Sequence, residues 1–183
     1  MTAEATKYVL TEEDIAHRKA CAYLKGLVIG HAVSMDRKWN GDTMKTPEFN
    51  KGYIVGLSSD ERDVTMAHIL YNRLRHDRPH LKSKQAELEF MSQNKYTLSN
   101  MFQGMESDGA KYPAQLRTDI LEEVNSYQAA LLEAQREAAR LKREQEAREA
   151  EERRIVREKK AKEERYRTFL KLKAEFEPEG VTV

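Results

Sequence analysis

The chain has 183 residues, of which 39% are hydrophobic and 34% are charged, and its mean hydropathy is −0.81. Its 32 basic and 31 acidic residues leave a net charge of +1, so overall charge favours neither a nucleic-acid partner nor a membrane. The single cysteine excludes an internal disulfide, and no run of about 18 apolar residues indicates a membrane span. Since the start of the chain also lacks the pattern of a leader peptide, we expect a cytoplasmic protein.

Helix-start signals divide the first part of the chain into short segments. Each signal is a hydroxyl residue placed just before a helical apolar pattern, and the four are Thr11, Thr46, Ser58 and Ser83. The expected helices cover residues 12–34, 47–57, 59–77 and 84–93, with one short helix within 94–113. Pro47 suits the first helical position and Pro79 ends a helix. A short strand at 53–55 is the alternative to the second helix.

Residues 114–176 contain neither glycine nor proline, which predicts one continuous helix about 90 Å long. Heptad steps from Ile120 and Val124 give a seam that is mostly apolar at both ends and mostly polar in the middle. The middle, 143–165, instead carries opposite charges four positions apart, which support a solvated helix. The expected pairs are Glu144–Arg148, Glu149–Arg153 and Glu158–Lys162. We therefore expect a charged helical rod, either a coiled coil or a single helix, with 120–141 docked on the preceding helices.

Two short words in the chain resemble each other at an interval of 26 residues. "LKGLVIGHA" at 24–32 is echoed by "NKGYIVGLS" at 50–58, and each word holds two glycines four positions apart. A phosphate-binding loop requires glycine before lysine, whereas here lysine precedes glycine. At helical spacing each glycine pair forms a smooth strip that another backbone can approach closely. The echo therefore predicts two helices that cross at their glycines; coincidence and a ligand against bare backbone are the alternatives.

A basic cluster lies where the third expected helix ends and a turn begins. It consists of Arg73, Arg75, Arg78, Lys82 and Lys84. Positive side chains near a helix C-terminus are favoured by the helix dipole, which is the structural explanation. The functional interpretation is a contact surface for an anionic protein or for nucleic-acid phosphates.

No motif in the chain indicates catalysis or a cofactor. His17, Cys21, His76 and His80 have zinc-ligand chemistry, but Pro79 separates the last two and breaks their helical geometry. A cysteine in the middle of a helix packs as a small apolar group more often than it acts as a nucleophile. We therefore expect no metal, no cofactor and no enzymatic activity.

The end of the long helix carries the strongest binding signal. Four large apolar side chains fall within eleven residues, and these are Tyr166, Phe169, Leu170 and Phe176. Water disfavours such a stripe, so a partner, a second copy or the head itself is expected to cover it.

These features predict an all-α protein with a compact helical head followed by one long charged C-terminal helix. The expected organisation is a flexible N-terminus at 1–10, the head at 11–112, the long helix at 113–177 and a tail at 178–183. The expected function is non-enzymatic interaction or assembly, in which the long helix self-associates or docks on a larger complex. Such compositions are common among virus-encoded accessory proteins, so an accessory or inhibitor role fits. Nucleic-acid binding through residues 73–84 is the alternative.

Overall fold

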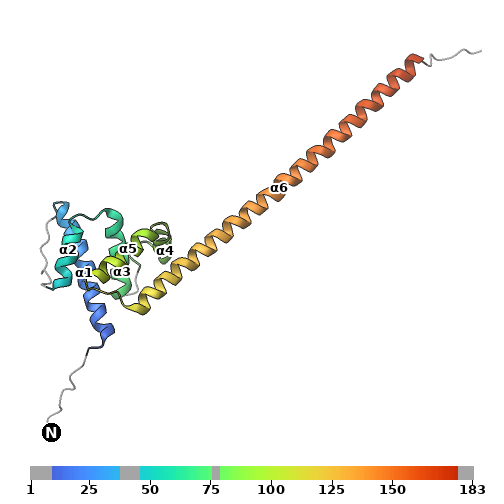
Figure 1. Cartoon of the computed structure of the whole chain (residues 1–183). Coiled ribbons are helices and arrows are strands. Elements are labelled where there is room, and N and C mark those ends of the chain that lie inside the picture. Colours follow the sequence, from blue (N-terminus) through green and yellow to red (C-terminus); the bar gives the residue numbers. More distant parts are fainter. Residues whose placement is uncertain (1–9, 38–45, 76–78, 177–183) are drawn as a thin grey trace, which may run out of the picture. The chain divides into compact units, whose positions relative to one another are not determined.

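The computed structural model of the protein describes residues 10–37, 46–75 and 79–176. These residues form six helices and no strand: α1 (Glu12–Ser34), α2 (Pro47–Gly56), α3 (Glu61–Arg75), α4 (Lys84–Gln93), α5 (Lys95–Ser107) and α6 (Ala114–Phe176) (Figure 1). The all-α class and the long C-terminal helix are thus confirmed, and the strand alternative at 53–55 is wrong. The predicted N-terminal segment and the predicted tail lie almost wholly outside the described residues.

Three of the four predicted helix caps are present. The Thr11 hydroxyl accepts from the Asp14 N–H at 3.1 Å, while the Asp14 carboxylate accepts from the Thr11 N–H at 2.9 Å. Thr46 and Ser83 accept from backbone N–H groups of Phe49 and Ala86 in the same way. Each cap satisfies a donor that the first turn of a helix otherwise leaves unpaired.

The predicted cap of α3 at Ser58 is wrong, and Asp60 takes its place. Asp60 Oδ1 accepts from the N–H groups of Arg62 and Asp63 at 2.9 and 3.0 Å, so α3 begins at Glu61. The Ser58 hydroxyl instead donates to the carbonyl of Val55 at 3.2 Å, at the end of α2. An ionised side chain is a stronger cap acceptor than a hydroxyl, which explains the choice.

The glycine echo predicts the packing of α1 against α2 correctly. A Cβ atom at Gly26, Gly30, Gly52 or Gly56 would come closer than 3.0 Å to a backbone carbonyl oxygen of the other helix. These oxygens belong to Phe49, Tyr53, Tyr23 and Leu27, respectively. The two helices run in the same direction side by side (Figure 1). Small residues four apart allow this close approach of backbones.

The α1–α2 contact has an internal two-fold relation. Gly26 meets the carbonyl of Phe49, and Gly52 meets the carbonyl of Tyr23. Tyr23 and Phe49 directly precede the two words and are 26 positions apart, as Gly26 and Gly52 are. Exchanging each residue for the one 26 positions away therefore turns one pair into the other. Both words therefore have the same packing role, which explains why the chain repeats them.

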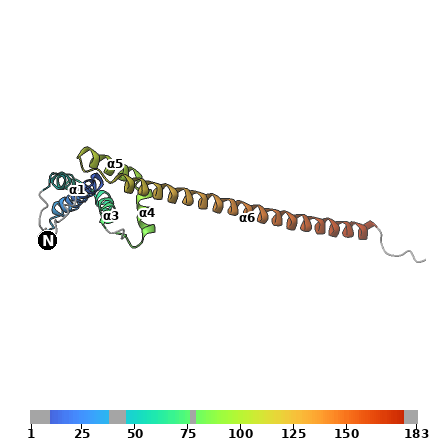
Figure 2. The same ribbon diagram turned by 90° about the horizontal axis from the view of Figure 1, so that it is seen from below.

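The main core joins α1, α3, α4, α5 and the first turns of α6, which Figure 2 shows grouped together from a second direction. Leu98, Met101, Phe102 and Met105 are buried at helical spacing on α5. Ile120 and Val124 bring α6 into the same cluster. The Tyr112 hydroxyl, also buried, donates to the carbonyl of Leu70 at 3.0 Å.

The chain divides into two compact units, Met1–Ala130 and Leu131–Val183, so the first turns of α6 belong to the first unit. Every residue from 131 to 176 is exposed to solvent. Of the stretch 120–141, which the sequence predicts to dock on the preceding helices, residues 120–130 belong to the first unit and 131–141 belong to the second. Leu131 and Leu141 belong to that predicted part and yet lie open to water.

Candidate interaction surfaces

The predicted partner-binding residues at the end of α6 are exposed. Their exposed fractions are 63% for Tyr166, 59% for Phe169, 45% for Leu170 and 80% for Phe176. Leu172, which the sequence analysis did not select, is 49% exposed beside them. Its apolar type within the same eleven residues was the signal that could have identified it. We call these five residues the C-terminal apolar cluster.

Helical geometry places most of this cluster on one face. Tyr166, Phe169 and Phe176 follow the spacing of a coiled-coil seam, with Lys173 at the remaining seam position. Leu170 and Leu172 flank that seam on its two sides. The same spacing recurs 35 residues earlier at Leu131, Ala134, Ala138 and Leu141, and these residues are exposed as well. α6 thus carries two apolar blocks with the same spacing, and the second has Lys173 at one of its four positions.

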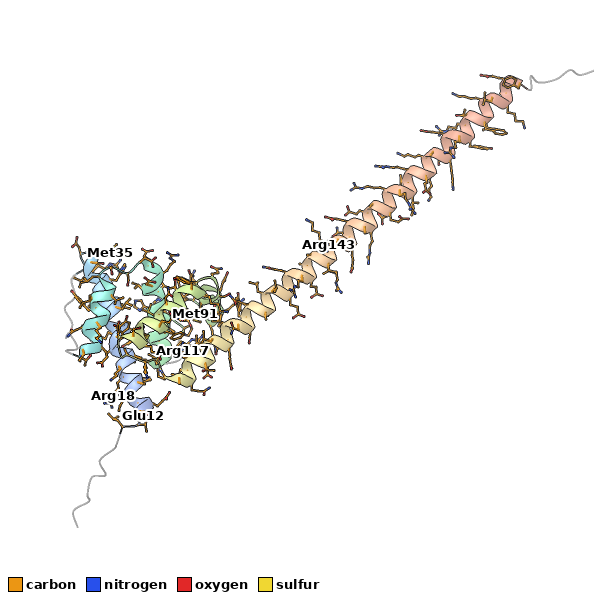
Figure 3. The ribbon with its side chains drawn as sticks, in the orientation of Figure 1. Glu12, Arg18, Met35, Met91, Arg117 and Arg143 are labelled. Atoms are coloured by element: carbon orange, nitrogen blue, oxygen red, sulfur yellow. The ribbon has the colours of Figure 1, made fainter. Side chains whose placement is uncertain are left out.

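The helix between the blocks is covered with charged side chains. Arg153 pairs with Glu149 at 3.5 Å, as the sequence predicts. The other two predicted pairings are replaced, because Glu144 pairs with Arg140 and Glu158 pairs with Arg154, each at 3.8 Å. Figure 3 shows side chains projecting around this part of α6, where Arg143 is labelled. Exposed pairs of this kind are each worth about 0.3–0.5 kcal/mol, so they support the helix only in number.

The basic cluster does not form one open surface, because Arg73 points inward. Its Nε donates to Glu87 Oε2 at 3.3 Å and its Nη1 donates to Glu123 Oε2 at 3.1 Å. The side chains of Arg73 and Glu87 are 8% and 1% exposed. Lys84 Nζ lies 3.1 Å from Glu123 Oε1. Two of the five predicted contact residues therefore tie α3 and α4 to α6.

Glu87 and Glu123 complete this network, which we call the Arg73 network, and sequence reasoning missed both. Partial burial acts to raise the pKa of Glu123, but Lys84 and Arg73 outweigh it and hold that pKa below its usual value. Glu87 also accepts from the backbone N–H of His80. The available signal was the spacing of Glu87 and Met91, which lie four apart on the buried face of α4.

The remaining basic residues lie on the surface or outside the described residues. Arg75 donates to the Tyr71 hydroxyl at 3.0 Å and its guanidinium lies 5.8 Å from the centre of the Tyr71 ring. Lys82 is exposed, and Arg78 lies outside the described residues. Among the described members of the cluster, Arg75 and Lys82 therefore face solvent. Neither of them has an acidic partner in the Arg73 network.

Three described histidines and the cysteine of the first unit contact other residues of that unit. His17 Nε2 lies 2.6 Å from the carbonyl of Leu74, and burial raises the pKa of the Cys21 thiol. His68 and His80 stack with their ring centres 4.5 Å apart and 3° between their planes. Within the described ranges, no group of three or more His, Cys, Asp or Glu side chains is placed to hold a metal ion. His76 lies outside these ranges.

The observations above define an all-α protein with a compact helical unit and an exposed charged helix. Among the described residues, none of the helices is both long and apolar enough to cross a membrane. Comparison of the chain with protein-family models, curated proteins and solved structures found no significant match.

Proposed function

We propose that this protein is a non-enzymatic assembly protein that binds another helix through residues 131–176 of α6. The observation that carries the proposal is the C-terminal apolar cluster. A solvated charged helix needs none of these five side chains for its own stability, because i,i+4 ion pairs already support it. Large apolar side chains gathered on an exposed surface mark contacts with other molecules.

The kind of partner follows from the pattern. Tyr166, Phe169 and Phe176 repeat at three- and four-residue intervals, which is how one helix presents knobs to another helix. A flat or concave surface would not require this repeat. We propose a second copy of the chain as the first partner, because α6 offers two blocks with the same spacing. A virus-encoded accessory role is compatible with this proposal.

Exchange between tagged and untagged copies of the full chain tests the proposal. The variant Tyr166→Gln/Phe169→Gln/Phe176→Gln keeps good helix formers but removes the apolar face. Each lost contact costs more than about 1.4 kcal/mol if it is buried in the complex, so co-purification of the two copies should fall more than about tenfold.

The matched control is Thr168→Gln/Lys171→Gln, which changes the opposite face of the same turns. This control should co-purify as well as the natural chain, and circular dichroism should show equal helix content in both variants. Equal co-purification by the two variants would refute the C-terminal apolar cluster as the binding site.

A further inference from the structure

The two apolar blocks of α6 have the same length and spacing. The first consists of Leu131, Ala134, Ala138 and Leu141, and the second consists of Tyr166, Phe169, Lys173 and Phe176. All eight residues are exposed on one continuous helix. The four residues of each block are separated by intervals of three, four and three residues, and this order of intervals is the same from either end of the block. A second helix can therefore match them in either direction, and the side chains decide which.

The charged middle of α6 is divided into an acidic half and a basic half. Residues 144–153 contain five acidic and two basic side chains and have a net charge of −3. Residues 154–163 contain five basic and two acidic side chains and have a net charge of +3. The change of sign falls between Arg153 and Arg154, which is also the midpoint between Leu131 and Phe176.

We propose that residues 131–176 pair with a second copy of the same helix in antiparallel orientation, centred between Arg153 and Arg154. The proposal rests on the proposed function and specifies its partner and geometry. It places Leu131 opposite Phe176, Ala134 opposite Lys173, Ala138 opposite Phe169 and Leu141 opposite Tyr166. Two-fold symmetry produces each of these pairs twice, as an isologous contact requires.

Packing favours this arrangement over a parallel one. An antiparallel pair sets the small Ala138 against the large Phe169, so that the facing side chains fill a nearly constant space between the helices. A parallel pair sets Ala138 against Ala138 and Phe169 against Phe169. The first of these layers leaves a gap and the second forces the helices apart, although packed helices keep an axial distance of about 8–10 Å.

Charge favours the antiparallel arrangement more strongly. It places the acidic residues 144–153 directly opposite the basic residues 154–163. In a parallel pair, each half faces its own copy, and like charges repel along the whole middle. Five charged seam residues would then each face the same residue of the other copy, and therefore an identical charge. They are Arg148, Glu152, Lys159, Lys162 and Lys173. The antiparallel seam keeps one like-charged contact, Arg148 with Lys159, in two symmetric places.

Crosslinking between two single-cysteine chains tests the orientation. Both chains carry Cys21→Ala, since Cys21 is the single natural cysteine. One chain also carries Leu141→Cys and the other Tyr166→Cys, with tags of different size. A thiol crosslinker with a reach of about 8–10 Å matches the spacing of packed helices. The matched control mixes Arg143→Cys with Glu164→Cys chains, which place cysteines at equal heights on the outer face.

The proposal predicts a covalent heterodimer from the Leu141→Cys and Tyr166→Cys mixture, and loss of crosslinking in each variant alone and in the control. Homodimers of each single variant would show a parallel pair and overturn the inference, while the proposed self-association would stand. A chain that sediments as a monomer and forms no crosslink would overturn both and direct attention to another partner. If Cys21→Ala prevents folding, a photo-crosslinking residue in place of Tyr166 gives the same readout in the natural background.

Discussion

At the scale of single residues, Arg73 shows how a residue predicted for binding can hold the fold together. The Arg73 network buries its charge against Glu87 and shares Glu123 with Lys84. The Nη2 atom of Arg73 is buried and has no hydrogen-bond partner among the described residues. Removing one member of a buried pair leaves an uncompensated charge, which costs about 3–5 kcal/mol.

Arg73→Leu should therefore destabilise the protein by about 3 kcal/mol, because it leaves Glu87 buried without its partner. The double variant Arg73→Leu/Glu87→Leu should recover a large part of this loss, since no charge then remains buried. Chemical denaturation of the natural chain, both single variants and the double variant measures the coupling between the two residues. Additive effects of the single changes would contradict the buried pair.

The surface residues of the basic cluster separate the two functional hypotheses. Arg75→Glu/Lys82→Glu should leave copy exchange and unfolding free energy nearly unchanged, because neither residue belongs to the Arg73 network or to α6. If the protein instead binds nucleic acid through this cluster, the same variant should lose binding to an oligonucleotide. Binding to a labelled oligonucleotide that weakens steeply with salt, and is lost in this variant, would favour the alternative function.

The environment of His68 predicts that the stability of the fold depends on pH. Burial first, and then the neighbouring His80, lowers the pKa of His68 below its ordinary value. In the unfolded chain His68 gains a proton near pH 6.5, but in the folded chain it does so at a lower pH. The unfolded state therefore binds more protons in this interval, and stability falls as the pH drops below about 7.

The natural chain should accordingly melt at a lower temperature at pH 5.5 than at pH 7.5. His68→Gln should reduce this difference, because it removes the group that binds protons unequally in the two states. Thermal unfolding of both chains at the two pH values tests the expectation. If the melting temperature of the variant falls as much between pH 7.5 and pH 5.5 as that of the natural chain, other groups cause the pH dependence.

At the scale of elements, the contact between α1 and α2 predicts that substitutions of its glycines destabilise the protein, whereas substitution of a glycine outside the contact does not. Gly30→Ala would place a methyl group against the backbone of Tyr53, and backbone cannot move aside as a flexible side chain can. We expect a loss of about 1–3 kcal/mol from this overpacking. Gly104 in α5 is the control, because a methyl group there would lie 3.8 Å from the Tyr23 hydroxyl, an ordinary contact.

Gly104→Ala should therefore stabilise the chain by about 0.5–1 kcal/mol through its better helix propensity. Denaturation curves of the two variants are compared with that of the natural chain. Equal effects of the same sign would show that the α1–α2 contact is looser than described.

The elements were predictable where local signals determine them. Thr11, Thr46 and Ser83 cap helices because their side chains reach backbone donors three residues ahead, and sequence spacing is enough to identify them. The long helix follows from 63 residues without a helix breaker. Asp60 was missed because Ser58 and Asp60 are both acceptable caps, and a choice between them depends on which backbone groups need partners.

The candidate site was predictable only in part, for a related reason. Exposure of Tyr166, Phe169, Leu170 and Phe176 follows from large apolar residues on a charged helix, a local pattern. The inward position of Arg73 depends on Glu87 and Glu123, which lie 14 and 50 residues further along the chain. Contacts over such separations arise from tertiary packing, and no periodicity in the sequence encodes them.

At the scale of the whole molecule, the two units should be separable in function. The first unit has its own core, which includes Ile120 and Val124, whereas residues 131–176 contribute no buried side chain. Removal of residues 164–183 should therefore leave the unfolding transition of the first unit unchanged and abolish copy exchange. Circular dichroism melts and pull-down of tagged copies check the two halves of this expectation. A truncated chain that still exchanges would place the contact elsewhere.

Self-association through α6 is the central claim, and sedimentation equilibrium of the intact chain tests it most directly. The natural chain should pass from monomer to dimer as its concentration rises, and Tyr166→Gln/Phe169→Gln/Phe176→Gln should remain a monomer over the same range. A natural chain that stays monomeric at every concentration, or a triple variant that dimerises equally well, would contradict the account.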